Sequence, residues 1–189
     1  MNEINEAGAI AAGVVQEVVD LLEHSGHEVY FGERVTQLEH ALQCAAAARE
    51  AGADDEAVLA ALLHDIGHLL GVPEGPVGVI DHDMLGRKWL LERGFSERVA
   101  TLVWGHVNAK RYLTATNPAY ASRLSDASVE TLRLQGGPLT PAEAEAFRQQ
   151  PLFQEMLQLR SWDEAAKVPG RQVLALESYR DLLARHLRR

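Results

Sequence analysis

Hydrophobic residues recur along this chain mostly at spacings of three and four, and runs of strict hydrophobic–polar alternation are scarce. Spacings of three and four place side chains on one face of an α-helix, whereas alternation would indicate a half-buried strand. The pattern therefore predicts an all-α fold. We expect helices at 8–24, 36–51, 55–69, 81–93, 96–113, 120–134, 141–149, 151–166 and 171–187.

Two of the predicted helices begin with the pattern of a capping box. In this motif a Ser or Thr side chain and a Glu three residues later each accept a hydrogen bond from the other's backbone N–H. The pairs are Thr36 with Glu39 and Thr140 with Glu143. Turn-forming residues concentrate at 71–78, so we expect a loop there between two helices.

Length and composition suit one folded domain. The chain has 189 residues, of which 47% are hydrophobic and 24% charged. That is enough to bury a single core, and it gives no reason to expect disorder. We therefore treat 1–189 as one domain. The net charge of -9 argues against a nucleic-acid-binding protein, whose phosphate contacts need clustered Lys and Arg.

The cysteine content and the N-terminus bear on the location of the protein. Cys44 is the only cysteine, so no intramolecular disulfide can form, which suits a reducing compartment. No apolar run approaches the ~20 residues that cross a bilayer, and the first residues are acidic where a signal peptide would be basic. We expect a cytoplasmic protein with no membrane partner, and the sequence leaves its oligomeric state open.

A group of polar residues interrupts the apolar segment AVLAALLHDIGHLL. His64 and Asp65 are adjacent, and His68 follows one helical turn after His64, so in a continuous helix the two imidazoles would share one face. A single histidine there would more often be a packed core residue. Imidazole and carboxylate together favour a transition metal, whose charge would offset the cost of burying the carboxylate.

Three further histidines lie in similar helical settings: His40 in TQLEHALQCA, His82 in IDHDML and His106 in VWGHVNAKRYL. Each of them alone would more often be structural than a metal ligand. Together with the HDIGH segment they favour a metal centre. The remaining histidines occupy a helix end, a polar turn and a basic tail, and we expect them to be exposed: His24, His27 and His186.

The order of these residues resembles the signature of HD-domain proteins, in which a His, an adjacent His–Asp pair and a late Asp hold a metal ion. Asp163 in SWDEAAKVPG supplies the late Asp. The two additional histidines resemble the subset of HD proteins that binds a second metal. The resemblance implies a helical bundle with Asp65 as bridging ligand, one ion on His40, His64, Asp65 and Asp163, and another on Asp65, His82 and His106.

A closer resemblance extends over roughly 30–170, through YFGERVTQLEHALQCA, HDIGH, GHVNAKRYL, SDASVETLRLQGGPLT and LRSWDEAAKVPG. Together these segments resemble the phosphonate-degrading HD oxygenases of the PhnZ and TmpB type. The resemblance implies two iron ions in a mixed-valent Fe(II)/Fe(III) state, with O2 as co-substrate. The implied reaction cleaves the C–P bond of a small organophosphonate, converting 1-hydroxy-2-(trimethylammonio)ethylphosphonate to glycine betaine or 2-amino-1-hydroxyethylphosphonate to glycine, each with release of phosphate.

Several polar residues near the predicted ligands could bind such an anion. Lys110 lies four residues after His106 on one helix face, and Arg160 lies three residues before Asp163. Charge-assisted hydrogen bonds to a phosphonate would be strong, although a solvated surface charge is the ordinary alternative for both. His68 could support a ligand, contact the substrate or be a packed histidine, and the resemblance favours a phosphonate contact. Ser128 could donate a hydrogen bond to the same group, although a serine in a helix is more often merely tolerated.

The segment VYFGERV precedes the predicted His40 helix and contains Tyr30 and Glu33. In the oxygenases that this segment resembles, such a Tyr and Glu form a latch over the metals, whereas the sequence alone would make Tyr30 an ordinary buried aromatic residue. Glu39 has two credible uses, as the partner of Thr36 in the capping box and as a contact to a substrate ammonium. The second use favours the trimethylated substrate slightly.

Two other classes of function fit part of the pattern. A metal-dependent HD phosphohydrolase acting on a nucleotide or another phosphate ester would share His40, His64, Asp65 and Asp163, but would not require Tyr30, Glu33 or Lys110. A non-catalytic HD module that senses a ligand would not need six plausible metal ligands. We therefore rank the oxygenase first and the phosphohydrolase second.

Overall fold

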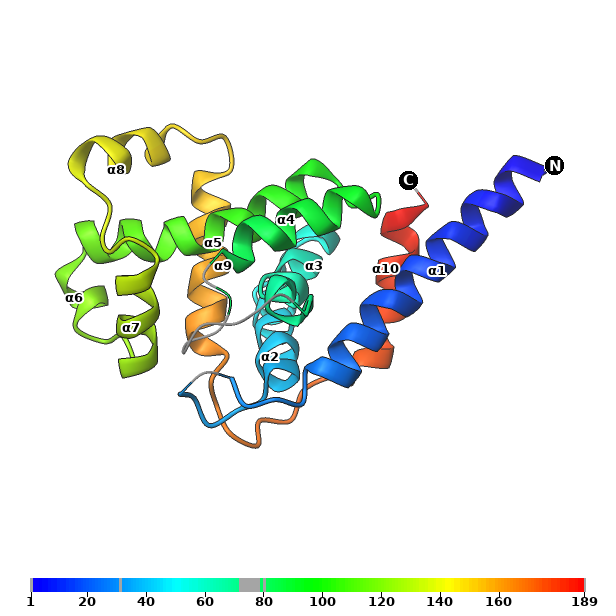
Figure 1. The fold of residues 1–189 in the computed structure, drawn as a ribbon, viewed down its shortest axis with the longest axis horizontal. Helices are drawn as coiled ribbons and strands as arrows, with labels where there is room; N and C mark the ends of the chain where they lie inside the picture. The colour runs from blue at the N-terminus through cyan, green and yellow to red at the C-terminus, as the bar shows by residue number, and fades with distance from the viewer. Residues whose placement is uncertain (1, 31, 72–78, 80, 189) are drawn as a thin grey trace.

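The computed structural model describes residues 2–30, 32–71, 79 and 81–188, which form an all-helical structure (Figure 1). Beyond helices, the described residues contain only an isolated antiparallel bridge between Val29 and Thr36. The prediction of an all-α fold is confirmed. The helices are α1 (Asn2–Ser25), α2 (Gln37–Glu50), α3 (Asp55–Leu63), η1 (Ile66–Leu69), α4 (His82–Glu92), α5 (Glu97–Thr116), α6 (Pro118–Ala121), α7 (Asp126–Leu134), α8 (Pro141–Arg148), α9 (Phe153–Ala165), η2 (Leu176–Tyr179) and α10 (Arg180–Leu187).

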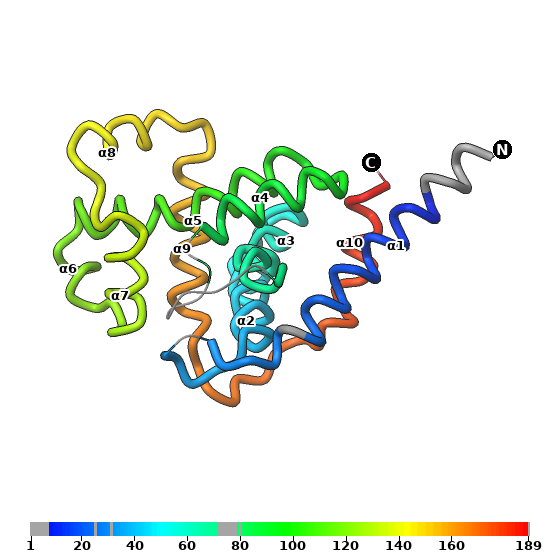
Figure 2. Tube along the Cα trace, in the orientation of Figure 1, coloured from blue at the N-terminus to red at the C-terminus, as the bar shows by residue number. Residues whose placement is uncertain are grey.

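Helix α3 lies at the centre of the bundle. Every residue from Ala57 to Leu63 is buried, as expected for a helix that is apolar on all sides. It packs against α2, α5, α9 and α10, and α5 packs in turn against α4 and α9. Figure 1 shows α1 beside α10 at one end of the molecule and α6, α7 and α8 at the other. The two termini lie at the α1 end (Figure 2).

Local sequence signals located four of the nine predicted helices closely. The predictions at 36–51, 81–93, 141–149 and 151–166 agree with α2, α4, α8 and α9 to within two residues at each end. Both capping boxes form, at Thr36 with Glu39 and at Thr140 with Glu143. The predicted loop at 71–78 lies outside the described residues apart from Gly71.

The prediction of one continuous helix over 55–69 was wrong. Helix α3 ends at Leu63, Asp65 leaves the α-helical region with φ -101° and ψ 11°, and a short 3-10 helix follows. A tertiary contact accompanies this break. A Cβ added to Gly67 would lie 2.0 Å from the carbonyl oxygen of His82, so the turn packs directly on the backbone of α4. Periodicity within one segment cannot reveal such a contact.

Two other predicted helices are divided. The prediction at 120–134 corresponds to α6 and α7, because Asn117 caps a short helix that starts at Pro118 and Ser125 caps a new one. The prediction at 171–187 begins too early, since regular structure starts at Leu176. Helices α1 and α5 are longer than predicted, starting at Asn2 and ending at Thr116.

Among the helices of the described residues, none is both long enough and apolar enough to cross a membrane. The prediction that three histidines are exposed holds for His24 and His27 but not for His186. The ring of His186 stacks on Phe95 and accepts a hydrogen bond from the backbone N–H of Ser96. It serves to dock α10 on the start of α5.

Candidate metal centre

Four histidines from four helices converge on the centre of the bundle. His40 comes from α2, His64 directly follows α3, His82 is the first residue of α4, and His106 lies in α5. All four are buried. Their Nε2 atoms meet in two pairs, His40 with His64 at 3.0 Å and His82 with His106 at 3.0 Å.

The hydrogen bonds of the four histidine rings show which ring nitrogen carries the hydrogen and which one faces the centre. Each Nδ1 lies 2.5–3.0 Å from a backbone carbonyl oxygen, those of Ala61, Val79, Val103 and Ala166. A carbonyl only accepts, so each Nδ1 carries a hydrogen and the Nε2 of a neutral ring is left with a lone pair. Two lone pairs at 3.0 Å repel each other, and a cation held between them would satisfy both.

Asp65 lies between the two histidine pairs. Its Oδ2 is 3.3 Å from Nε2 of His64 and 3.6 Å from Nε2 of His40. Its Oδ1 is 3.3 Å from Nε2 of His82 and 3.4 Å from Nε2 of His106. One carboxylate therefore offers an oxygen to each pair, which is the arrangement of a bridging ligand.

Asp163 completes the first group from α9. Its Oδ1 lies 3.3 Å from Nε2 of His40. Within the described residues, this oxygen and Oδ2 of Asp65 are buried without a hydrogen-bond partner. Burial alone would raise the pKa of both carboxyls, but the neighbouring imidazoles, and Arg160 beside Asp163, hold both pKa values well below the usual range. Buried, ionised oxygens of this kind normally have a cation as partner.

The cluster attracts positive charge even without metal. Burial disfavours a charge on His64, but the contributions of Asp65 and Cys44 together exceed this effect and raise the pKa of His64. Metal ions and protons would therefore compete for this group. The donor set of imidazole and carboxylate fits transition metals such as iron.

His68 also lies close to the cluster, and Asp65, His68 and His82 offer ligand atoms within 4.8 Å of one another. We nevertheless exclude His68 as a ligand. Its Nδ1 accepts a hydrogen bond from the backbone N–H of Val79 at 3.2 Å, so Nε2 of the neutral ring carries a hydrogen. Burial and the neighbouring His82 keep it neutral, holding the pKa of His68 well below its usual value. His68 is thus a hydrogen-bond donor beside the metal centre.

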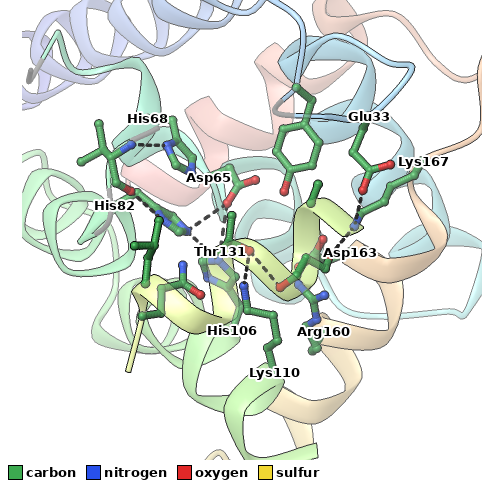
Figure 3. A pocket seen from close by; sticks show the side chains of 16 residues that line it. Glu33, Asp65, His68, His82, His106, Lys110, Thr131, Arg160, Asp163 and Lys167 are labelled. Carbon is green, nitrogen blue, oxygen red and sulfur yellow. Dashed lines mark hydrogen bonds and ion pairs between the residues drawn. The ribbon is translucent and has the colours of Figure 1, made fainter. Parts of the chain in front are cut away.

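A cavity opens on one side of this centre (Figure 3). Ten of its lining residues had been predicted as site residues: Tyr30, Glu33, Asp65, His68, His82, His106, Lys110, Ser128, Arg160 and Asp163. The other described lining residues had not: Val79, Ala127, Thr131, Leu134, Gln135 and Lys167. His40 and His64 do not line the cavity, and both are fully buried.

Lys110 and Arg160 are buried, which excludes the alternative that they are solvated surface charges. Lys110 lies on the same α5 face as His106 and donates to Oγ1 of Thr131 at 3.0 Å. Burial and, next to it, the charge of Arg160 lower the pKa of Lys110 to about 7. Within the part of the chain that the structure describes, Lys110 has no carboxylate partner, and a buried lysine of this kind favours an anionic ligand in the cavity.

Arg160 is already engaged at all three guanidinium nitrogens. Its Nε donates to the hydroxyl of Tyr120 at 2.8 Å, and its terminal nitrogens pair with Asp163 and Glu164. The main effect of Arg160 in this structure is therefore to orient Asp163. The guanidinium keeps further N–H groups beyond these three bonds, so a substrate contact stays a prediction.

Tyr30 and Glu33 both reach the cavity from the segment before α2. The Tyr30 ring stacks on His40 with 4.1 Å between centroids, and burial with the charges of Asp65 and Asp163 raises the pKa of Tyr30. It is a neutral phenol next to the centre. Glu33 accepts a hydrogen bond from Oγ of Ser125 at 2.7 Å.

Glu39 is not brought to the site. Its side chain is exposed and accepts a hydrogen bond from the backbone N–H of Thr36 at 2.7 Å, closing the capping box. It is absent from the cavity lining among the described residues. Of the two uses predicted for Glu39, this structure shows the helix cap.

Comparison with known proteins agrees with the geometry. The family model described as HD domain matches residues 38–142, which is more than half of the chain. The chain belongs to the HD-domain family. The matched range covers the predicted ligands from His40 to His106 but ends before Asp163, which the tertiary structure brings to the same cluster.

Individual relatives show which HD-domain proteins this chain is similar to. A [1-hydroxy-2-(trimethylamino)ethyl]phosphonate dioxygenase (glycine-betaine-forming) of Leisingera caerulea is 39% identical over 82% of this chain and 80% of its own length. A hydroxymethylphosphonate dioxygenase of Gimesia maris is also 39% identical, over 87% and 84%. An uncharacterized protein of Acanthamoeba polyphaga mimivirus is 37% identical over 92% and 81%. This HD domain is thus related to phosphonate dioxygenases.

Sequence reasoning missed three polar residues of the HD-domain cavity: Thr131, Gln135 and Lys167. Lys167 could have been found, because it follows Asp163 by four residues, as Lys110 follows His106. Thr131 and Gln135 belong to the face of α7 that starts with Ser128. The predicted helix over 120–134 already placed Thr131 one turn after Ser128, so this spacing could have found Thr131.

Proposed function

We propose that this chain cleaves the C–P bond of a small 1-hydroxyalkylphosphonate with O2. The observation that carries the proposal is one cavity that combines a metal centre with a buried lysine, Lys110, which has no carboxylate partner among the described residues. In the overall reaction a 1-hydroxyalkylphosphonate and O2 give a carboxylate, inorganic phosphate and a proton. Carbon is oxidised from the alcohol to the carboxylate level, and one O2 takes up all the electrons that carbon loses.

The proposed cofactor is a pair of iron ions in the mixed-valent Fe(II)/Fe(III) state. His40, His64, Asp65 and Asp163 would hold one ion, and Asp65, His82 and His106 the other. The second group has fewer protein ligands, which leaves positions for exogenous ligands. When bound, the metal pair supplies the activation of O2 and the redox chemistry. The protein residues bind and orient the substrate.

The anion would be held in the cavity beside the metal centre (Figure 3). The Lys110 ammonium, the Ser128 hydroxyl and the Nε2–H of His68 are the proposed phosphonate contacts, since all three can donate to anionic oxygen. Tyr30 and Glu33 are proposed to cover the cavity, because both line it from the single segment between α1 and α2. Arg160 acts mainly through Asp163.

The position of Glu39 removes the reason for preferring the trimethylated substrate. Glu39 had favoured the trimethylated substrate, but its carboxylate lies outside the cavity and closes a helix cap. The two phosphonate dioxygenases are equally similar to this chain, at 39% identity. Neither Glu39 nor the comparison therefore selects between a substrate with a cationic substituent and one without.

Oxygen dependence tests the proposed function. Iron-loaded protein is incubated with hydroxymethylphosphonate and with 2-amino-1-hydroxyethylphosphonate, in air and under nitrogen. We expect phosphate and carboxylate to appear together in air, with one O2 consumed for each, and no phosphate under nitrogen or after chelation of the metal. Phosphate release under nitrogen, particularly from a phosphate monoester such as p-nitrophenyl phosphate, would instead establish the phosphohydrolase alternative.

The pKa of Lys110 predicts a pH-dependent affinity for anions. Lys110 is charged below its pKa of about 7 and neutral above it, so its contribution to anion binding is fully present at pH 6 and is lost as pH rises. Inorganic phosphate changes its own charge in the same pH range. We therefore compare two affinities for phosphate at each pH, that of wild type and that of Lys110→Arg, whose side chain stays charged, and take their ratio. We expect this ratio to fall by roughly tenfold or more between pH 6 and 9.

Isothermal titration of metal-loaded protein with phosphate at several pH values measures this ratio. A ratio independent of pH would show that Lys110 is charged throughout the range. It would then remove Lys110 as the pH-sensitive anion contact.

A further inference from the structure

The short helix α6 brings the hydroxyl group of Tyr120 to Arg160. The side chain of Asn117 caps α6 by accepting a hydrogen bond from the backbone N–H of Tyr120 at 3.1 Å. The hydroxyl oxygen of Tyr120 in turn accepts a hydrogen bond from Nε of Arg160 at 2.8 Å. Both of these residues are buried. The contact joins α6 to α9 across 40 residues of sequence.

The two terminal nitrogens of Arg160 contact carboxylates of its own helix. One pairs with Oδ2 of Asp163, three residues further on, and the other with Oε2 of Glu164, four residues further on. The other oxygen of Asp163, Oδ1, is the one that faces Nε2 of His40 at 3.3 Å. Figure 3 shows Arg160 beside Asp163 at the edge of the cavity. Arg160 therefore holds one carboxylate oxygen and leaves the second directed at the histidine cluster.

Two contacts within one helix do not by themselves fix the plane of the guanidinium group. Asp163 and Glu164 are adjacent residues of α9, so the Arg160 side chain could tilt towards either carboxylate. The guanidinium group is a rigid, planar fork, and a third hydrogen bond from outside α9 therefore sets its plane. Tyr120 supplies this third bond at Nε.

The hydroxyl group of Tyr120 is suited to this contact. Burial raises the pKa of Tyr120 to about 12, so the side chain stays a neutral phenol that accepts from Arg160 and directs its O–H to Glu164 at 3.5 Å. Among the described residues, Tyr120 is the only acceptor for Nε of Arg160. Without the hydroxyl group this buried N–H would lack a partner, which is unfavourable. The guanidinium group would then turn to another acceptor and loosen its hold on Asp163.

We propose that Tyr120 is a positioning residue of the metal centre, whose hydroxyl group fixes Arg160 and thereby holds Asp163 in the orientation that binds metal. The effect should be confined to the ion on the His40 side of the centre, because Asp163 is the one predicted ligand that Arg160 contacts among the described residues. This inference rests on the proposed pair of metal ions and is independent of the reaction that they support.

The test compares wild type with Tyr120→Phe, which removes the hydroxyl group and keeps the ring. Tyr112→Phe is the matched control, because Tyr112 is a half-buried tyrosine of α5 that packs on Phe147 and Phe153 and does not line the cavity. Fe(II) is titrated under nitrogen into metal-free protein in competition with a chromogenic chelator, which gives a Kd for each of the two ions. Thermal unfolding of the metal-free proteins is the second measurement.

We expect Tyr120→Phe to raise the Kd of one ion about tenfold, as is common when the outer hydrogen-bond partner of a ligand is lost. The Kd of the other ion should change by less than about twofold, which is the usual margin for independent sites. Tyr112→Phe should leave both Kd values unchanged. The metal-free proteins should unfold cooperatively, so that weaker metal binding does not reflect a failure to fold.

The same substitution in an Arg160→Met background separates positioning from a general structural effect. If Tyr120 acts through the guanidinium group, its hydroxyl group has no further effect once that group is gone, so Tyr120→Phe should then change neither Kd. A general structural contribution would be the same in both backgrounds. Arg160→Lys, which lacks the Nε–H but keeps the charge, serves if the Met variant fails to fold.

Two results would overturn the inference: Kd values of Tyr120→Phe that both lie within about twofold of wild type, or the same change in Kd with Arg160 and without it. Failure of the proposed reaction looks different. Wild type would then bind two ions but release no phosphate from a hydroxyalkylphosphonate in air, while the Kd values would still decide the role of Tyr120. If wild type bound fewer than two ions, the paired metal centre and this inference would both be wrong.

Discussion

Replacement of Asp65 by Asn is expected to abolish binding of both metal ions and to lower turnover by more than about 100-fold. Loss of even an outer hydrogen-bond partner of a ligand commonly costs 10–100-fold in metal affinity or activity, and Asp65 lies at the centre of the cluster. Each of its oxygens faces a different histidine pair at 3.3–3.6 Å. An amide keeps the shape but presents an N–H group to one pair and loses the charge that offsets the two cations.

Metal analysis of the purified proteins measures this effect, with phosphate release in air as the second readout. Asp83→Asn is the control, because Asp83 is a buried carboxylate beside His82 that does not line the cavity. It should keep two ions per chain. An Asp65→Asn variant that also kept two ions and most of its turnover would show that Asp65 does not bridge them.

Replacement of Gly67 by Ala is expected to remove the second metal ion and leave the first. The new Cβ would lie 2.0 Å from the carbonyl oxygen of His82 and 2.9 Å from its Cα. Because these are backbone atoms at the start of α4, they cannot rotate away, and the helix start must move. His82 would then no longer face His106 at 3.0 Å, whereas His40, His64 and Asp163 come from other helices.

We expect metal content to fall from two ions to about one per chain, with loss of most turnover. Overpacking at such a contact also destabilises a protein by roughly 1–3 kcal/mol, which thermal unfolding would detect. Gly13→Ala is the matched control. A Cβ at Gly13 meets nothing within 4 Å, and alanine in a helix interior is more favourable than glycine by up to ~1 kcal/mol. A Gly67→Ala variant that retained both ions would contradict the role of this close packing.

The site could be predicted from sequence to a considerable extent because several of its signals are local. His64 and Asp65 stand out as polar residues within the apolar segment AVLAALLHDIGHLL, and Lys110 follows His106 by one helical turn. The order of His40, the His64–Asp65 pair and a late Asp resembles a known family, and that family is confirmed. Spacing along a helix could not show, however, that Arg160 also donates a hydrogen bond to Tyr120, which lies 40 residues away in the sequence.

Glu39 and His68 illustrate why roles were harder to predict than positions. Glu39 had two credible partners, and only the direction of its side chain, towards the Thr36 backbone, distinguishes them. His68 could have been a ligand or a donor. The choice depends on the hydrogen bond that Nδ1 of His68 accepts from the backbone N–H of Val79, which lies 11 residues away in the sequence, beyond the reach of helical spacing.

The sequence by itself determined that the chain is helical, where most helices begin, and which residue types would bind metal. Those properties follow from spacing and capping within a few residues, and from the chemistry of imidazole and carboxylate. The tertiary structure alone decided that α3 stops at Leu63, that Asp65 faces two histidine pairs, and that Lys167 meets Glu33. Each of these depends on contacts between distant segments, whose geometry is set by packing of the whole bundle rather than by local periodicity.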